Sequence, residues 1–150
     1  MFVYLTASAD AEYNASAYAY KIGSFSVVSE RHLGWTVVEA YLHGYLALST
    51  EIIKKHLYHS AYTYTVCTPS KPVIKLLTTS WLEVLHDNNW KDPEGKPVFY
   101  LSVLKELYYH RMFYKERNVN WDILTELNTS SYQLYELCVD KVKSELEVGE

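Results

Sequence analysis

Cysteine, glycine and long apolar runs are all scarce in this sequence, and each scarcity excludes a class of protein. Cys67 and Cys138 are the only cysteines and lie outside any CxxC or Cys/His cluster, so they predict free buried thiols and no zinc site. The five glycines form no GxGxxG or GxxxxGKS/T loop that would bind nucleotide phosphates. No apolar run approaches the ~20 residues needed to span a bilayer, and no basic segment followed by an apolar one marks a leader. We therefore expect a cytoplasmic protein without a membrane partner.

An excess of positive charge is also missing. Fourteen lysines and arginines stand against eighteen aspartates and glutamates, a formal net charge of −4, and the basic residues are scattered along the chain. Nucleic-acid binders usually gather such residues into a stripe. The six histidines form no HxH or HExxH pattern, which favours packed or solvated side chains over a metal site. Tyrosine is abundant, with fifteen residues, and suits strands, cores and protein interfaces alike.

The hydrophobic pattern predicts a single α/β domain over residues 1–150. Strands are expected within 112–125, with VNWDIL at the centre, and at 2–8, 17–22, 25–32 and 61–67. Helices are expected at 35–56, from Pro69 through Leu77, at the start of 81–98, at 98–110, and from a capping box at Ser130 and Gln133 onward. The tight link at Gly23 and Ser24 makes the second and third strands antiparallel. This order predicts a five-stranded mixed sheet, its first three strands antiparallel, flanked by helices.

One stretch, residues 81–98, has a spacing specific enough to suggest a family. It reads WLEVLHDNNWKDPEGKPV: a tryptophan, a Trp-Lys pair nine residues later, and a loop that closes with Lys-Pro-Val. This spacing resembles the handle region of bacterial-type ribonuclease HI. Weaker matches to that family follow in the same order at 5–8, 17–19, 39–46, Trp121 and 135–138. The whole chain is therefore similar to the ribonuclease H superfamily, which implies its fold, with residues 81–98 as the handle.

The resemblance implies a chemistry that the matching positions lack. Members of the family cleave the RNA strand of RNA–DNA hybrids with two divalent metals, held by carboxylates on the first strand, the first helix, the fourth strand and the last helix. The matching residues here are Thr6, Glu39, Thr68 or Ser70, and Tyr135. Residues 52–82 contain no Asp or Glu, and a hydroxyl is a poor substitute for a carboxylate as a metal ligand. We therefore predict a pseudoenzyme that holds no metal and no cofactor.

The same comparison indicates that this chain binds nucleic acid more weakly than the family does. Family handles are rich in lysine and arginine, which hold phosphates, whereas acidic residues are at least as numerous as lysines in residues 86–97. The glycine-rich loop of the family becomes DAEYNASA, which has no glycine and two acids. We therefore predict a protein-binding adaptor, a use of this fold that suits a viral or phage genome. A non-cleaving nucleic-acid-binding module is the first alternative, and an atypical active metal-dependent nuclease is the second.

Two segments are the candidate contact surfaces for a protein partner. In the handle, the candidate residues are Trp81, Trp90, Lys91 and Lys96. In the aromatic run that follows, they are Tyr108, Tyr109, Arg111, Phe113 and Tyr114. Aromatic residues and arginine are enriched among the residues that carry binding energy in protein interfaces. For the aromatic run, packing in the core or in a strand is the alternative.

Overall fold

The computed structural model describes residues 1–58, 63–125 and 128–148 and contains one five-stranded sheet. In the spatial order β3-β2-β1-β4-β5, the strands are β1 (Phe2–Asp10), β2 (Ala15–Ile22), β3 (Val28–Leu33), β4 (Thr63–Cys67) and β5 (Asn120–Leu124). The first three strands pair antiparallel, whereas β4 pairs parallel with both β1 and β5. The predicted mixed α/β sheet is thus confirmed.

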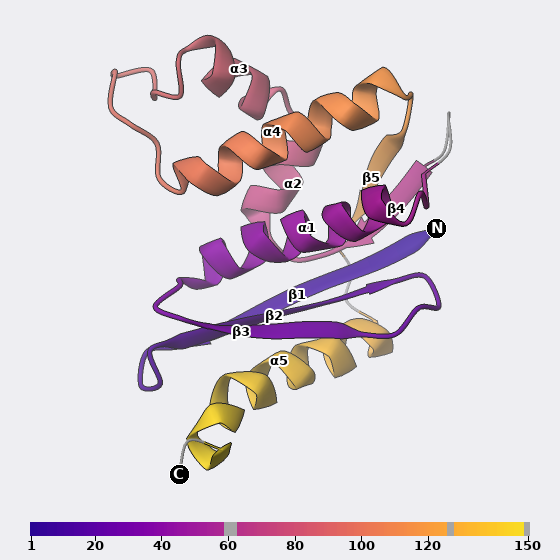
Figure 1. Ribbon diagram of the computed structural model, residues 1–150, viewed down its shortest axis with the longest axis vertical. Helices are drawn as coiled ribbons and strands as arrows, with labels where there is room; N and C mark the ends of the chain where they lie inside the picture. The colour runs from indigo at the N-terminus through magenta and orange to yellow at the C-terminus, as the bar shows by residue number, and fades with distance from the viewer. Residues whose placement is uncertain (59–62, 126–127, 149–150) are drawn as a thin grey trace.

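Helices cover both faces of the sheet. They are α1 (Val37–Lys54), α2 (Lys71–Thr78), α3 (Trp81–Asp87), α4 (Leu101–Glu116) and α5 (Thr129–Val148). In Figure 1, α1 lies on one face and α5 on the other, while α3 and its following loop extend away from the sheet. The buried side chains accordingly form a large cluster on the α1 face and a smaller one under α5. Among the described residues, no helix is both long and apolar enough to cross a bilayer.

Two local features fix the position of α1. Its first turn is held by a capping box, in which the Thr36 side chain accepts from the Glu39 backbone N at 3.2 Å and the Glu39 carboxylate accepts from the Thr36 backbone N at 3.2 Å. Farther along, Gly44 faces the sheet, and a Cβ built there would lie 2.9 Å from both Leu5 Cδ1 and Tyr18 Cβ. That separation is shorter than packed carbon atoms allow, so only glycine lets α1 come this close.

The fourth helix is longer than predicted. The helix expected at 98–110 continues to Glu116, so the aromatic run is helical and belongs to no strand. It ends where Asn118 adopts a left-handed backbone, with φ of +55°, and Val119 N donates to Tyr114 O at 3.0 Å. Asparagine tolerates this conformation and commonly follows a helix end, which is the signal that would have placed the boundary.

Other boundaries differ by smaller amounts. The Asn128 side chain caps α5 by accepting from Ser131 N at 2.9 Å, so the predicted capping box at Ser130 is wrong. The third strand begins at residue 28, whereas it was expected to span 25–32. Residues 61 and 62 of the expected fourth strand lie outside the described residues.

Candidate functional site

A pocket of about 190 Å³ lies where β1 and β4 separate. The two strands pair only as far as Tyr4 and Cys67, and β1 then continues without β4. In open α/β sheets, ligands tend to bind where neighbouring strands diverge in this way. We call it the switch-point pocket, and its lining residues are Tyr4, Leu5, Thr6, Tyr41, Cys67, Pro69, Ser131, Tyr132, Leu134 and Tyr135.

The centre of the switch-point pocket is a hydrogen bond between two hydroxyl groups. Tyr41, from the second turn of α1, hydrogen-bonds with the side chain of Thr6 and with the backbone of Ala7. Burial raises the pKa of Tyr41, and these hydrogen bonds lower it by a smaller amount. Thr6 is only 5% exposed, so this contact is shielded from solvent. A phenol ring therefore fills space beside the position matched to the family's first aspartate.

Glu39 does not reach this centre. Its carboxylate belongs to the capping box with Thr36, and it is absent from the pocket lining. Tyr41, two residues later on α1, occupies the pocket instead. Glu39, the residue matched to the family's helical carboxylate, is thus used to cap α1 and does not line the switch-point pocket. The Thr-x-x-Glu spacing of a capping box was the available signal for its true role.

Thr68 and Ser70 are buried but serve the turn into α2. Thr68 Oγ1 accepts from Ser70 N at 3.3 Å, and Ser70 Oγ accepts from Val73 N at 3.3 Å. These bonds satisfy backbone donors at the start of a helix that carries Pro72 in its first turn. Neither hydroxyl lines the switch-point pocket, whose wall here is made by Cys67 and Pro69.

The remaining wall comes from the start of α5. Tyr135 is 46% exposed and lines the pocket mouth beside Tyr132. Beneath them, Cys138 is buried, and its Sγ donates to Thr6 O at 3.6 Å. Burial raises the pKa of both thiols, that of Cys138 to about 12 and that of Cys67 upward, so both stay protonated at neutral pH. The described lining thus carries no carboxylate and no thiolate.

Metal-binding geometry is equally lacking elsewhere in the part of the chain that the structure describes. Within residues 1–58, 63–125 and 128–148, no three His, Cys, Asp or Glu side chains come together as a group able to hold an ion. Divalent magnesium or manganese binds through hard oxygen ligands, chiefly carboxylates. The chemistry of the switch-point pocket is therefore that of hydroxyl groups and apolar walls.

Comparison with solved structures identifies the architecture. No protein-family model and no curated protein matches the sequence. The foamy viral protease-reverse transcriptase bound to dsDNA superposes with a TM-score of 0.74 at 13% identity, over 95% of this chain and 94% of that chain. The same protein bound to an RNA/DNA hybrid gives 0.71 at 12% identity, over 95% and 20%. The PFV RNase H domain in solution gives 0.64 at 11% identity, over 95% and 92%. This chain has a ribonuclease H-like fold.

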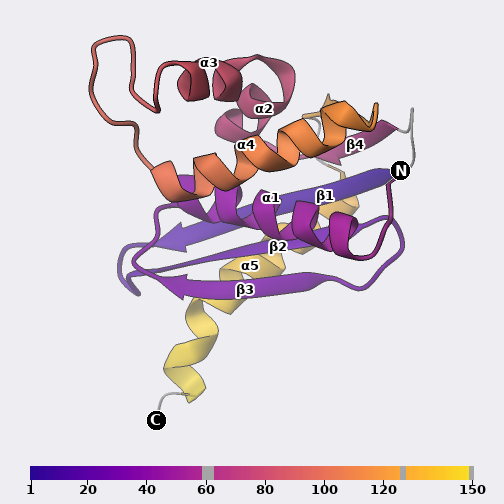
Figure 2. The same cartoon turned by 45° about the horizontal axis from the view of Figure 1, so that its top comes forward.

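The handle of this ribonuclease H-like fold keeps its shape through its own hydrogen bonds. Asn88 Nδ2 donates to Lys91 O at 2.9 Å and to Asp92 O at 3.1 Å. Asp92 Oδ1 accepts from Glu94 N and Lys96 N, both at 2.9 Å. Figure 2 shows the resulting loop standing away from the helices of the domain. These hydrogen bonds hold the loop in a defined, projecting shape. Lys96 pairs with Glu94 at 3.7 Å, so it adds little positive charge to the loop.

The two handle tryptophans hold the projection to the domain. Trp81 is half-buried, with Lys75 Nζ 4.6 Å from its ring centroid. Trp90 is also half-buried and meets the ring of Tyr108 edge-on, with centroids 5.8 Å apart. Lys91, by contrast, is exposed. Of the predicted handle contacts, the lysines face solvent, while the tryptophans are partly used inside the protein.

The aromatic run on α4 divides in the same way. Tyr114 is 3% exposed, and its hydroxyl lies 2.8 Å from Ser49 Oγ, so the prediction that it contacts a partner is wrong. Phe113 is half-buried under Arg117, whose guanidinium lies 3.6 Å from the ring centroid. Tyr109 is 67% exposed and remains available. Tyr108 stacks on His86 of α3 at 4.2 Å. Packing in the core therefore explains Tyr114 fully and Tyr108 and Phe113 in part.

Arg111 also has an internal role. Its guanidinium donates to Leu76 O at 2.6 Å and to Thr79 O at 2.9 Å, and Nε lies 2.5 Å from Glu83 Oε1. The two carbonyls belong to the end of α2 and the turn after it, and Glu83 belongs to α3. One side chain on α4 thus fastens two preceding helices, which a sequence pattern cannot reveal.

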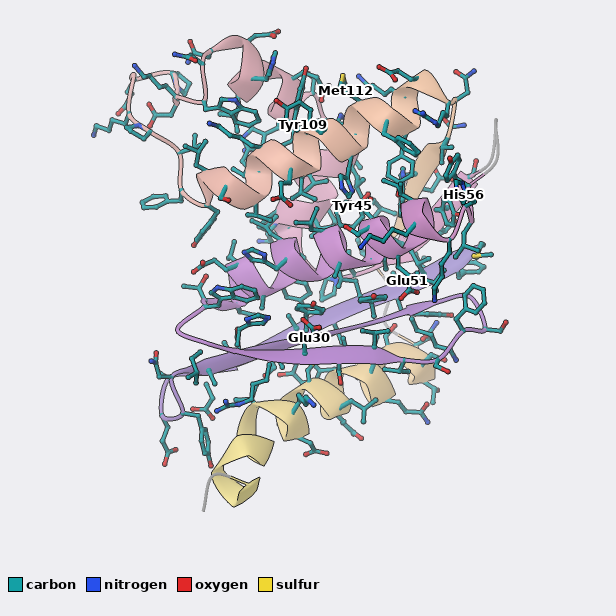
Figure 3. All side chains as sticks on the ribbon, viewed as in Figure 1. Glu30, Tyr45, Glu51, His56, Tyr109 and Met112 are labelled. Atoms are coloured by element: carbon teal, nitrogen blue, oxygen red, sulfur yellow. The ribbon has the colours of Figure 1, made fainter. Side chains whose placement is uncertain are left out.

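Sequence reasoning missed an exposed apolar residue on α3. Val84 is 58% exposed and follows Glu83, which reaches α4 through Arg111 and Lys115. Figure 3 labels Tyr109 on the outer side of α4. We define the α3–α4 face as His86, Tyr108 and Tyr109, whose rings contact one another in sequence.

Proposed function

We propose that this domain does not cleave RNA and instead acts by binding a partner protein. The observation that carries the proposal is the Tyr41–Thr6 hydrogen bond at the centre of the switch-point pocket. Two-metal hydrolysis needs two dications held a few ångströms apart, and carboxylates must offset their charge. Neutral hydroxyls and a phenol ring supply neither the charge nor the space.

Binding of nucleic acid without cleavage is the second candidate, because two of the solved neighbours carry dsDNA or an RNA/DNA hybrid. Charge argues against it here. The net charge is −4, and three acids accompany two lysines between residues 86 and 97. Affinity for phosphates grows with each cation that releases counterions, so this surface is a weak phosphate binder.

A protein contact is supported by the α3–α4 face. Its aromatic side chains belong to helices that are fastened to each other by the Arg111–Glu83 pair and the His86–Tyr108 stack. Rigid aromatic residues contribute much contact area for a small loss of side-chain entropy. The face therefore offers a preformed surface without the cationic charge that nucleic acid requires.

A labelled RNA–DNA hybrid incubated with the full chain is expected to remain intact in the presence of Mg²⁺ or Mn²⁺. The same hybrid should show no anisotropy change at low salt, because the surface lacks a basic stripe. The matched control is Tyr41→Phe, which removes the hydroxyl but keeps the ring and should behave identically. Cleavage that EDTA abolishes would establish an active nuclease, and salt-dependent binding without cleavage would favour the second candidate.

Affinity capture from the native cell is expected to recover a partner that resists nuclease treatment. Tyr109→Asp should weaken that capture by at least about tenfold, because it places a charge at the most exposed ring of the α3–α4 face. Leu33→Asp is the matched control, since Leu33 is equally exposed, at 66%, but lies on β3. Recovery that disappears with nuclease, or that both variants reduce equally, would contradict a protein partner on this face.

A further inference from the structure

A second pocket, of about 450 Å³, lies between the handle and the body of the domain. Its walls come from α1, α2, α3 and the segment that leads from the handle into α4. All but three of its lining residues are apolar or aromatic, and those three carry charge. Clefts of a few hundred cubic ångströms with mostly apolar walls and a few polar groups are typical small-molecule sites. We call this pocket the handle cleft.

The floor of the handle cleft is fixed by packing between helices. Leu42 of α1 and Leu104 of α4 are 1% and 2% exposed and belong to the main core. One side is formed by Tyr100, whose hydroxyl lies 3.4 Å from Thr36 Oγ1 at the start of α1. Figure 1 shows the handle loop returning into α4 at the same end of the molecule as the start of α1. The cleft is therefore preformed in the folded chain.

Aromatic rings line the open side of the cleft. Phe99 is 84% exposed, the highest value among the large apolar side chains of the described residues. Its ring centroid lies 6.1 Å from that of Tyr100, and Trp81 of α3 lines the same cleft. Covering exposed apolar surface is favourable, and flat aromatic bodies pack well against rings. These side chains therefore favour a ligand that contains an aromatic ring.

Two lysines of α2 supply the positive charge of the cleft. Lys71 and Lys75 are exposed, lie four residues apart on the same side of the helix, and both line the cleft. None of the ion pairs among the described residues includes either of them. Lys75 Nζ lies 4.6 Å from the ring centroid of Trp81, which places this ammonium beside a ring of the cleft. Both cations are therefore free to pair with an anionic group.

One carboxylate, that of Asp92, also lines the cleft, and it has partners of its own. Its Oδ1 accepts from the backbone N of Glu94 and of Lys96, both at 2.9 Å. Two lysines and one aspartate give the lining a formal charge of +1. A single negative charge balances this lining, whereas a phosphate dianion would add repulsion with Asp92. The charges therefore favour a monoanion.

We propose that the handle cleft binds a small aromatic monocarboxylate. Its carboxylate pairs with Lys71 and Lys75 through charge-assisted hydrogen bonds, and its ring lies against Trp81 and Phe99. The buried leucines of the floor accept the remaining apolar surface. The site uses no residue of the α3–α4 face or of the switch-point pocket, so it is independent of the proposed partner protein.

Indole-3-acetate and indole-3-acetamide are matched probes for the ¹⁵N-labelled full chain, because they share ring and size and differ in charge. Indole-3-acetate should move the Trp81 indole signal in a saturable way and leave those of Trp35 and Trp121 in place. At low salt it should bind about fivefold more tightly than the amide, since exposed lysines contribute modestly to such pairs. Added salt should reduce this preference, because it screens the lysines.

Variants separate the two parts of the site. Lys71→Gln/Lys75→Gln should abolish the preference for the acid. Lys105→Gln/Lys143→Gln removes the same charge at exposed positions outside the cleft and should preserve the preference. Phe99→Ala should weaken both probes by the same factor, because it removes ring contact and no charge.

Three results would overturn the proposal: an unmoved Trp81 signal at millimolar indole-3-acetate, equal affinities of the wild-type chain for the two probes, or a preference that survives Lys71→Gln/Lys75→Gln. Thymidine monophosphate is the third probe, and tighter binding of this nucleotide than of indole-3-acetate would also overturn it. The Trp81→Phe variant assigns the indole signal by its disappearance. If that variant fails to fold, saturation-transfer signals of the probes still give their affinities for the other chains.

Discussion

Thr6→Asp is expected to lower the free energy of unfolding by about 2–4 kcal/mol at neutral pH. Thr6 is 5% exposed, and its hydroxyl is bonded to Tyr41. A carboxylate at this position would be surrounded by a phenol, a thiol and apolar side chains, with no lysine or arginine in the described lining. An aspartate at position 6, the residue that the family resemblance implies there, would therefore destabilise the folded chain.

The pH dependence of this variant follows from the same burial. Desolvation raises the pKa of the new carboxyl in the folded state above its unfolded value of about 3.9. The folded state then binds the proton more tightly than the unfolded state, so the loss of stability is absent below about pH 3.9 and grows as the pH rises through the raised folded pKa. Urea unfolding of wild type and variant at a series of pH values measures this difference directly.

Two controls separate burial of charge from loss of the Tyr41 contact. Thr6→Val keeps the shape and removes only the hydroxyl, and it should cost about 1 kcal/mol with no dependence on pH. Millimolar Mg²⁺ should not restore the stability of either variant, because the described lining has no other carboxylate to complete an ion site. Recovery of Thr6→Asp by Mg²⁺ would mean that the pocket still accepts a metal and that the proposed lack of catalysis is wrong.

The topology could be predicted because its signals are local. The link at Gly23 and Ser24 and the alternation of strands and helices predict the order of elements along the chain and a mixed sheet without knowledge of distant contacts. The handle spacing adds a third local signal. Helix ends were less certain, since Asn118 acts through its left-handed backbone and Asn128 through a side-chain cap, and composition alone shows neither.

The candidate site could be predicted only in part, because its roles depend on tertiary contacts. A two-residue change on α1 rotates a side chain by about 200° around the helix, so Glu39 caps the helix while Tyr41 lines the pocket, and the sequence pattern did not single out Tyr41. From the sequence alone, the aromatic run on α4 likewise looks like one continuous contact surface. Only packing against α1 shows that Tyr114 is internal.

Arg111→Met is expected to lower the free energy of unfolding by about 2–3 kcal/mol. The side chain is 17% exposed, and its removal leaves the Leu76 and Thr79 carbonyls without their donor and Glu83 without its closer cation. Lys115 stays 3.3 Å from Glu83, so the loss is smaller than for a fully buried pair. Arg111→Lys should recover less than half of it, because one ammonium cannot reach two carbonyls and a carboxylate at once.

A double-mutant cycle with Glu83→Gln distinguishes the two roles that Arg111 has been assigned. If the arginine fastens α2 and α3 to α4, the two changes should couple by at least about 1 kcal/mol in urea unfolding. Lys115→Met, which removes a 54% exposed cation from the same carboxylate, should cost less than about 1 kcal/mol. An Arg111→Met chain as stable as wild type that nevertheless loses its partner would make Arg111 the interface residue that the sequence predicted. Loss of stability in Arg111→Met, with Tyr109→Asp remaining stable, would place recognition on the outer side of α4 and structural support on the inner side.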